Sequence, residues 1–540
     1  MHARFALLLA LVALSLGTPA LADPLSDLKA RGVLRWGADQ EGGGPYVYPR
    51  DDDPDRVTGF EVDLATALAA KLALKPEFTQ AAWDKLPDML ETSKVDVVLN
   101  GYELTPERAD AMTPSMPYYV YALALLTRTD DGSITRWEDL TSEPGGHRVR
   151  IGVLGGSAAE TLANELCASG KGCDVRAYEG NTDTMTEVET GKLDATIEDT
   201  PIARFYASRF PKLHVVGEPR RNGYYVMYVP KGADALAREI DGALVDLALS
   251  GELQRIYERY GIWDERQKEI LELARSARFF RVGHAPVATP RPAASAPTND
   301  EPTGRAEPAP PSEPTAIPSA RKRGVDVVAA YGKTLLEAAG LTVLLSVTSF
   351  PLAILVGLLI AIGRLYGPAW VRWPLAAYVE FLRGTPLMLQ LYFLFFLLPV
   401  VGVALPALPT AILGLAINYS AYESEIYRAG LQAIPRGQME AALALGMSRS
   451  MALRRIIVPQ AVRIVIPPVV NDFIALFKDT SVCSVITLVE LTKRFSILSQ
   501  STQATVELMA MTAVLYLAMS YPMSVLAQRI ERRLGLEARA

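Results

Sequence analysis

The stretch LTVLLSVTSFPLAILVGLLIAI, residues 341–362, decides the fold class of the C-terminal part of this 540-residue chain. Its 22 residues carry no charge, and about 20 apolar residues are enough for one helix across the hydrocarbon core of a membrane. Four more apolar stretches follow it. The sequence therefore predicts an all-α transmembrane domain over residues 326–540, with spans at about 341–362, 377–400, 406–426, 463–488 and 507–527.

The second and third of these spans share one long apolar stretch. Residues 384–422 are uncharged for 39 positions and are punctuated by prolines, so they are expected to supply most of two helices. Four ionisable residues lie in or beside the later spans: Glu423, Glu425, Lys478 and Asp479. They could pair with one another inside the bundle, or mark a transport path as intramembrane ionisable groups often do. Both interpretations stay open.

The N-terminus has the pattern of an export signal. Residues 1–22 contain a basic residue, an apolar run and a small-residue A-x-A pattern ending at Ala22, which is typical of a cleavable secretory signal. The alternative is a short membrane anchor. In both cases the following segment is delivered outside the cytoplasm. A disulfide between Cys167 and Cys173 is plausible in such an oxidising compartment.

Residues 23–265 alternate strand and helix patterns. Strands are expected in GVLRWGAD, PEFTQA, VDVVLNG, RVRIGVLGG, LDATIED and GYYVMYVP, and helices in GFEVDLATALAAKLAL and DKLPDMLETSK. Such alternation indicates a mostly parallel sheet covered by helices. Two units of this kind predict an α/β domain of two lobes, with a ligand cleft where the strands end.

A proline-rich segment separates the two parts of the chain. Residues 286–318 hold ten prolines among Ala, Ser, Thr and Glu. This composition builds no core and behaves as an extended, semi-stiff linker. We expect a tether over residues 266–325, between the exported domain and the membrane domain.

Basic residues predict the orientation of the spans. Five spans put the two ends on opposite sides, so an exported first domain places the C-terminus in the cytoplasm, as in a multi-pass protein of a bacterial inner membrane. The expected cytoplasmic connections and tail carry Arg364, Arg372, Arg428, Arg436, Arg449, Arg454, Arg455, Arg529, Arg532 and Arg533. The expected outer loops carry only Lys493 and Arg494. Residues 321–323 are basic on the wrong side, but they follow a large exported domain, where this rule is weak.

One of the expected cytoplasmic connections has a specific local structure. EAALALGMSRSMALRRIIVP, residues 440–459, begins with strong helix formers, continues with Gly446, which suits a left-handed helix stop, and offers Ser448 as the next helix cap. A short helix and a tight turn in a basic loop indicate a docking surface. The stretch resembles the EAA loop of ABC-importer permeases, which implies that residues 437–459 dock on an ATPase subunit. The matching residues are Glu440, Ala441, Ala442 and Gly446.

The resemblance extends over the chain from Thr334 to its C-terminus. FLRGTPLMLQ, NYSAYESEIYRAGLQAIPRGQ, IVPQA and FKDTSV are similar to blocks of the polar amino acid permease family. In this chain, residues 332–334 (GKT) mimic the end of a phosphate loop, but Val327 stands where that loop needs a glycine. We therefore expect no enzyme activity and no cofactor here, with ATP hydrolysis on a separate chain.

The exported domain resembles the periplasmic solute-binding proteins of family 3. GFEVDLATALAAKL, residues 59–72, is similar to the signature of that family. The resemblance implies a type II two-lobed fold in which Arg108, in TPER, clamps a ligand α-carboxylate, a role that a bidentate guanidinium suits. It implies that Asp199, in LDATIED, binds the α-ammonium group. The other predicted ligand-binding residues are Trp83 as a stacking aromatic, Ser157 at the second-lobe hydroxyl position, Gly101 and Tyr102. The alternative for Arg108 and Asp199 is surface charge in loops that flank helices.

Two positions depart from the pattern of this family. An aromatic residue usually precedes Pro45, and here EGGG stands before it. Ser or Thr usually stands where Glu103 stands. A carboxylate there would repel a ligand carboxylate unless Arg108 neutralises it or the ligand presents a cation. Asp39 matches a position that binds cationic side chains in some members, so the sequence favours a basic or otherwise atypical amino-acid-like solute.

These observations predict a solute-binding protein fused to its permease. Five helices make half a pathway, so we expect a homodimer of the permease domain with two ATPase subunits, surrounded by membrane lipid. The net charge of −6 excludes a nucleic-acid binder on bulk electrostatics. A ligand-gated channel is one alternative, but in such channels the pore interrupts the lobes, whereas here the lobes end before the spans begin. A dehydratase-like enzyme on the same fold, with Glu103 as the acid, is the other.

Overall fold

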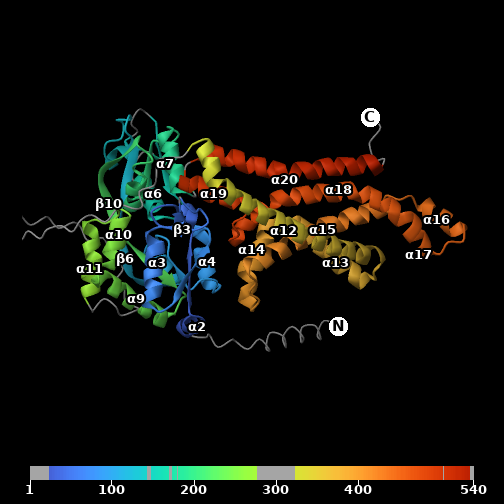
Figure 1. The fold of residues 1–540 in the computed structure, drawn as a ribbon, viewed down its shortest axis with the longest axis horizontal. Helices are drawn as coiled ribbons and strands as arrows, with labels where there is room; N and C mark the ends of the chain where they lie inside the picture. The colour runs from blue at the N-terminus through green and yellow to red at the C-terminus, as the bar shows by residue number, and fades with distance from the viewer. Residues whose placement is uncertain are drawn as a thin grey trace, which may run out of the picture. The chain divides into compact units, whose positions relative to one another are not determined.

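The computed structural model describes residues 24–50, 52–142, 147–168, 173–178, 180–276, 323–502 and 504–534. The predicted signal, residues 1–22, and the proline-rich stretch, residues 286–318, lie outside the described residues. The described chain forms two compact units, one made mostly of residues 24–276 and the other mostly of residues 323–534 (Figure 1).

Within the described residues, one eight-stranded sheet runs through the first unit in the order β4-β1-β5-β10-β6-β9-β7-β8. Its strands are β1 (Val33–Ala38), β4 (Lys75–Gln80), β5 (Val97–Val98), β6 (Thr113–Arg128), β7 (Val149–Leu154), β8 (Cys173–Tyr178), β9 (Ala195–Asp199) and β10 (Leu213–Val229). A separate small pair joins β2 (Tyr48–Pro49) and β3 (Val57–Thr58). The strands expected from the sequence are found in β1, β4, β5, β7, β9 and β10, whereas β6 and β8 were not among them.

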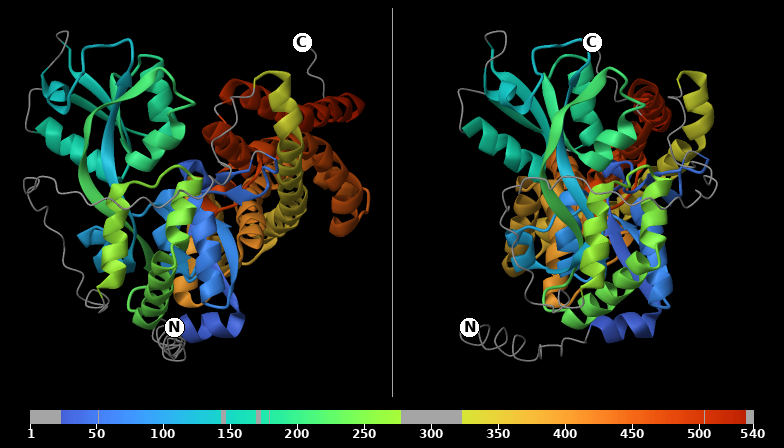
Figure 2. Two further views of the ribbon diagram at one scale, coloured as in Figure 1. Left: turned by 60° about the vertical axis from the view of Figure 1, so that its left-hand side comes forward. Right: turned by 90° about the vertical axis from the view of Figure 1, so that its left-hand side faces the viewer.

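The two longest strands, β6 and β10, belong to both lobes. They pair antiparallel, with Tyr224 of β10 opposite Val120 of β6. Near one end β10 also pairs with β5, and near the other end β6 pairs with β9. Each lobe adds parallel pairs outside them, β1 with β5 and β7 with β8 and β9. The two lobes are therefore joined by two strands that run from one to the other (Figure 2), which confirms the two-lobed α/β fold.

Helices cover the faces of this sheet. The first lobe carries α2 (Pro24–Arg31), α3 (Phe60–Lys71), α4 (Leu86–Glu91), α5 (Pro106–Ala111), α9 (Asp234–Leu249), α10 (Glu252–Arg259) and α11 (Lys268–Arg275). The second lobe carries α6 (Ala158–Ala168), α7 (Asn181–Glu189) and α8 (Thr200–Tyr206). α3 buries one side because its apolar residues recur at helical spacing, with Phe60, Leu64 and Leu68 fully buried.

The folded part of the first unit extends beyond its predicted boundary at residue 265. α11 lies in the range expected to be a linker, yet Ile270 and Ala274 on one face of it are buried. Just before the helix, the Gln267 side chain accepts a hydrogen bond from the Val120 N–H and donates one to the Val120 carbonyl, at 3.0 and 2.8 Å. The apolar face of α11 is too short to stand out in sequence, so the linker was predicted to begin too early.

The second unit is helical. Its helices are α12 (Val325–Tyr366), α13 (Ala369–Gly384), α14 (Leu387–Tyr392), α15 (Ala407–Gln432), α16 (Arg436–Ala444), α17 (Arg449–Ala452), α18 (Val458–Asp479), α19 (Leu491–Thr502) and α20 (Thr505–Leu534). α12 packs along α15, and α18 packs along α20 (Figure 1). Among the described residues, three helical stretches are long and apolar enough to cross a membrane: Val325–Tyr366, Arg449–Ile486 and Thr505–Arg529. The count of five spans stays a prediction.

The single helix expected over residues 377–400 is not found. α13 ends at Gly384 and α14 begins at Leu387, with Thr385 in an extended conformation between them. Pro386 explains the break, because proline lacks an N–H and disfavours a helical conformation in the residue before it. The Gln390 side chain donates hydrogen bonds to the carbonyls of Leu382 and Thr385, at 2.9 and 3.1 Å. It thereby satisfies acceptors that the interrupted helix leaves open.

Gly357 sets the close packing of α12 on α15. A Cβ atom built on it would lie 2.7 Å from the Glu423 Cβ and 2.9 Å from the Ser420 carbonyl oxygen, which is backbone and cannot turn aside. Gly340, on the same helix, has open space around its position, with nothing within 4 Å of a built Cβ. Gly340 and Gly357, two of the four glycines of α12, therefore differ in whether a methyl group fits.

We predict that Gly357→Ala destabilises the second unit and Gly340→Ala does not. Overpacking at Gly357 should cost about 1–3 kcal/mol, whereas alanine at Gly340 has the higher helix propensity and no clash. Thermal unfolding of the purified full-length protein in detergent measures both. Equal melting temperatures for the two variants would contradict the close approach of the helices.

Candidate functional site

A small cavity of about 40 Å³ lies between the two lobes of the first unit. Its lining includes six of the eight ligand-binding residues predicted from the sequence: Asp39, Trp83, Gly101, Glu103, Ser157 and Asp199. Arg108 and Tyr102 are the two that do not line it, and they lie directly behind Glu103 and Trp83. The structure thus brings the predicted residues together from both lobes.

Arg108 is held at the start of α5 and packs against aromatic rings. The Thr105 side chain caps this helix by accepting a hydrogen bond from the Arg108 N–H, at 3.3 Å. The guanidinium lies 4.9 Å from the ring centroids of both Trp83 and Tyr102, a cation–π arrangement. Tyr102 is buried and stacks on Trp83 with their centroids 4.7 Å apart, so it supports the site from behind.

Both Nη atoms of Arg108 already donate hydrogen bonds. Its Nη1 atom forms an ion pair with the Glu103 carboxylate and donates to the Glu103 carbonyl at 3.3 Å. Its Nη2 atom donates to the Gly156 carbonyl, in the other lobe, at 3.2 Å. Burial by itself would lower the pKa of the Arg108 guanidinium, but the Glu103 carboxylate outweighs it and the pKa is raised. Arg108 therefore stays charged and is bonded to both lobes.

Glu103 connects the two lobes through its side chain. One carboxylate oxygen pairs with Arg108, and the other accepts a hydrogen bond from the Ala158 N–H at 3.0 Å. Ala158 is the first residue of α6, where free N–H groups and the helix dipole favour a negative charge. Glu103 is only 3% exposed. A buried carboxylate therefore sits between a guanidinium of one lobe and a helix N-terminus of the other.

One wall of the cavity is fixed by a network around Asp39. Its carboxylate accepts hydrogen bonds from the N–H groups of Glu41 and Trp83, at 3.0 and 2.9 Å. The Asn100 side chain accepts from the Asp39 N–H at 2.9 Å, and the Trp83 indole donates to the Asn100 carbonyl at 3.1 Å. These bonds hold the Trp83 ring in place as an aromatic wall.

Two further acids come from the end of β9. The Asp199 carboxylate accepts a hydrogen bond from the Tyr225 hydroxyl, and the Tyr225 and Tyr46 hydroxyls lie 2.7 Å apart. Burial, and then the charge of Glu103, raise the pKa of Asp199 well above its usual range. Burial raises the pKa of Glu198 to about 7, although hydroxyl donors lower it in part. Glu198 and Asp199 therefore lose their protons less readily than exposed acids do, and a cationic partner would favour their charged forms.

Ser157 and the second-lobe backbone complete the opposite side. The Ser157 hydroxyl donates to the Leu154 carbonyl at 2.7 Å, so this side chain is held within its own loop. Sequence reasoning missed Tyr46, Asn100, Asn181 and Glu198, which also line the cavity. Tyr46 had a signal: the family pattern led us to look for an aromatic residue before Pro45, and one follows it instead. The other three carried none.

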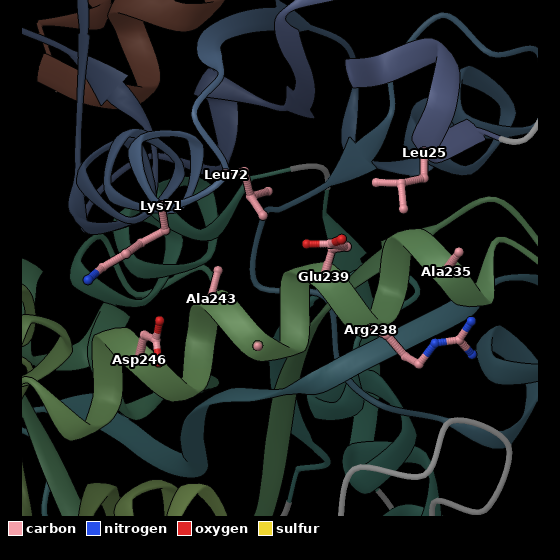
Figure 3. Close-up of a pocket in the computed structure, with 9 residues that line it drawn as sticks. Leu25, Lys71, Leu72, Ala235, Arg238, Glu239, Ala243 and Asp246 are labelled. Atoms are coloured by element: carbon pink, nitrogen blue, oxygen red, sulfur yellow. The ribbon is translucent and has the colours of Figure 1, made fainter. Parts of the chain in front are cut away.

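The larger hollow of the first unit lies elsewhere. It has a volume of about 540 Å³ and is formed by residues of α2, α3 and α9. Figure 3 shows Glu239, Ala243 and Asp246 along α9, with Lys71 and Leu72 of the neighbouring segment across from them. None of the predicted ligand-binding residues lines this hollow.

Cys167 and Cys173 are joined by a disulfide in the structure. The bond connects the end of α6 to the start of β8. Cys483 is a free, buried cysteine of the second unit.

The predicted helix and turn of the EAA-like stretch are confirmed. α16 ends before Gly446, which has φ +81°, and the N–H groups of Gly446 and Met447 donate to the carbonyls of Leu443 and Ala442 at 3.0 and 3.1 Å. This is the double hydrogen bond of a Schellman helix stop. The Ser448 side chain then caps α17 by accepting from the Met451 N–H at 3.3 Å. Glu440, Ala441 and Ala442 lie on α16.

Comparison with known proteins finds a different family in each unit. Residues 34–262 match the bacterial extracellular solute-binding proteins, family 3, and residues 353–536 match the inner membrane component of binding-protein-dependent transport systems. The L-cystine transport system permease protein TcyB of Bacillus subtilis is 37% identical over 194 residues, covering 36% of this chain and 83% of that protein. The glutamine transport system permease protein GlnP of Escherichia coli is 34% identical over 205 residues, covering 37% and 93%.

Solved structures also resemble the first unit. The ancestral amino acid-binding protein AncCDT-1, a precursor of cyclohexadienyl dehydratase, is 30% identical with a TM-score of 0.40, and the match covers 44% of this chain and 98% of that one.

We predict that Arg108→Met destabilises the first unit strongly. It removes the charge partner of the buried Glu103 carboxylate, and breaking a buried pair on one side costs about 3–5 kcal/mol. The double variant Arg108→Met with Glu103→Gln removes both charges of this pair, so it should recover much of the loss. Thermal unfolding of the full-length protein gives the coupling between the two positions.

The exposed pair of Lys29 and Glu239, with side chains 54% and 43% exposed, is the matched control. Lys29→Met should cost at most about 1 kcal/mol, because surface ion pairs contribute little. An Arg108 variant no less stable than the Lys29 variant would contradict the buried pairing.

Proposed function

The chain belongs to the amino-acid permeases of ABC importers, with a family 3 solute-binding domain ahead of its permease domain, and from this we propose how the two units divide the work. It is a multi-pass inner-membrane subunit of an amino-acid ABC importer. The first unit captures the solute outside the cytoplasm, and the second passes it across the membrane with its C-terminus on the cytoplasmic side. The relatives of the second unit are permeases, so a ligand-gated channel or an enzyme is not favoured.

The solute site is the cleft between the two lobes. In our proposal Asp199 binds a positively charged group of an amino-acid-like solute, and Trp83 stacks against the body of the solute. Arg108 binds a carboxylate at one end of the cleft. The observation that carries this is the convergence of the predicted residues on one cavity from both lobes. Its volume of about 40 Å³ leaves room for about one water molecule. Binding therefore requires the lobes to part, and the hinge is the pair of strands β6 and β10.

The turn after α16 is the coupling element. We assign it to a cytoplasmic ATPase subunit because the helix stop presents an apolar side chain to its surroundings: Leu445 is 82% exposed at the end of the helix, and Met451 is 44% exposed on α17. Exposed apolar groups on a rigid helix end are suited to a protein partner. The proposed assembly has two copies of this chain, which contact each other through their permease domains, and two ATPase subunits.

We predict that Gly446→Val uncouples ATP hydrolysis from transport, whereas Gly437→Val does not. Neither position has an atom within 4 Å of a built Cβ, so the two differ in backbone only: Gly446 has φ +81°, and Gly437 lies inside α16. A β-branched residue at positive φ forces the turn to rearrange. In liposomes containing the ATPase subunit, Gly446→Val should lose solute-stimulated ATP hydrolysis while solute binding persists. Normal uptake by this variant would refute the docking role.

The solute site is tested by Asp199→Asn. Removing the charge proposed to hold the solute cation should weaken solute affinity by about a hundredfold or more, with the melting temperature nearly unchanged. Asp130→Asn is the control, because that carboxylate lies at the surface with its side chain 79% exposed. Calorimetric titration of both variants against the transported solute gives the result. An affinity unchanged within threefold in Asp199→Asn would show that the solute binds elsewhere.

A further inference from the structure

The carboxylate of Glu103 occupies two donors that together could bind a solute carboxylate. Arg108 is the only basic side chain that the described contacts bring to this end of the cleft, and its Nη1 atom pairs with Glu103. The other strong donor is the Ala158 N–H at the start of α6, and it donates to the second oxygen of the same carboxylate at 3.0 Å. One carboxylate of the protein therefore bridges a guanidinium and a helix N-terminus, which together form an anion site.

Two further hydrogen bonds hold the same guanidinium. Arg108 Nη1 donates to the Glu103 carbonyl, and Nη2 donates to the Gly156 carbonyl at 3.2 Å. The same guanidinium lies 4.9 Å from the ring centroids of both Trp83 and Tyr102. An arriving carboxylate could reach the Nη1 atom and the Ala158 N–H together only by displacing Glu103.

The rest of the cavity is lined by acidic and aromatic side chains and suits a cation rather than an anion. Its lining contains the side chains of Asp39, Glu198 and Asp199 besides Glu103, and no Lys, Arg or His. Its other walls include the aromatic rings of Tyr46 and Trp83. Acid groups with aromatic walls suit an ammonium or guanidinium group, through charge pairing and cation–π contact.

We propose that Glu103 stands in place of the solute's own carboxylate when the cleft is closed, and that the solute is a small organic cation, an amine or a guanidine, without a free carboxylate. This rests on the proposed function of the cleft as the solute site. It narrows that function from amino-acid-like solutes to those whose carboxyl group is absent or masked as an amide.

The two kinds of solute differ in what they do to the buried Glu103 carboxylate. A free amino acid would push a carboxylate that is 3% exposed away from both of its partners and leave it buried beside a second negative charge. A cation without a carboxylate leaves both partners of Glu103 available when the lobes close. It also gives Asp199, whose pKa burial holds well above its usual range, the positive partner that it lacks in the closed cleft.

The test compares matched pairs of compounds on the wild-type, full-length protein in detergent by calorimetric titration. The pairs are arginine with agmatine and lysine with cadaverine, which differ by the carboxyl group, and argininamide and lysinamide are added as carboxyl-masked forms. We expect the carboxyl-free and masked members of at least one pair to bind at least about tenfold tighter than the free amino acid. The wild-type comparison alone decides, so it does not depend on any variant folding.

Glu103→Ser then tests the mechanism. It removes the carboxylate and frees Arg108 and the Ala158 N–H, so the free amino acid should gain at least about tenfold in affinity while its carboxyl-free partner changes little. Glu103→Gln, which keeps the shape of the side chain, should shift the preference in the same direction. A preference left unchanged by both variants would overturn the role of Glu103.

A second titration of the wild type against the twenty common amino acids distinguishes a failure of this inference from a failure of the proposed solute site. If a free amino acid binds more tightly than every carboxyl-free or masked compound, the present inference is wrong and the cleft remains the solute site. If no compound of either kind binds, the assignment of the cleft as the solute site fails, and this inference fails with it.

Discussion

The antiparallel pairing of β6 with β10 is the constraint on which the first unit depends. All other strands of the eight-stranded sheet are built outward from these two, on one lobe and on the other. The same pairing positions the cleft: Glu103 forms a β-bridge with Tyr225 of β10, and Asp199 lies opposite Leu123 of β6. The Tyr228 hydroxyl of β10 also donates to the Glu103 carbonyl, at 3.1 Å. Because both acids are tied to the hinge strands, any change in lobe angle acts directly on the site.

The buried acids of the cleft differ in whether they have a positively charged partner. A buried carboxylate normally costs free energy unless it is paired and hydrogen-bonded, and Glu103 has both a guanidinium and a helix N-terminus. Among the described residues, Asp199 and Glu198 have only neutral hydroxyl donors, and burial raises the pKa of each. The carboxylate at the Arg108 end of the cleft is thus paired with positive charge, whereas the acids at the β9 end have no such partner among the described contacts. In the proposed function this asymmetry favours a cationic solute.

The second unit is governed by local backbone chemistry to a greater extent. Pro386 interrupts an apolar run that would otherwise continue as one helix, and a single side chain, Gln390, repairs the carbonyls at the break. Gly446 stops α16 in the left-handed conformation, and Ser448 starts α17. Each of these features depends on residues only a few positions apart. The helix packing depends on more distant pairs, such as Gly357 against α15.

The sequence by itself determined what short-range rules control. The apolar run of α12, the helix α3, the stop at Gly446 and the two-part organisation follow from hydrophobic length, helical spacing and turn chemistry, all of which are written in neighbouring residues. β6 could not be predicted this way, because apolar and polar residues do not alternate along its buried run. α11 has too few apolar positions for their helical spacing to be recognised. Only the tertiary structure decided that the Glu103 carboxylate accepts a hydrogen bond from the N–H of Ala158, 55 residues away. It alone also decided that Glu198 and Tyr46 line the same cavity as Asp199. The physical reason is that contacts between lobes are fixed by the hinge strands, whose pairing leaves no pattern in either segment alone.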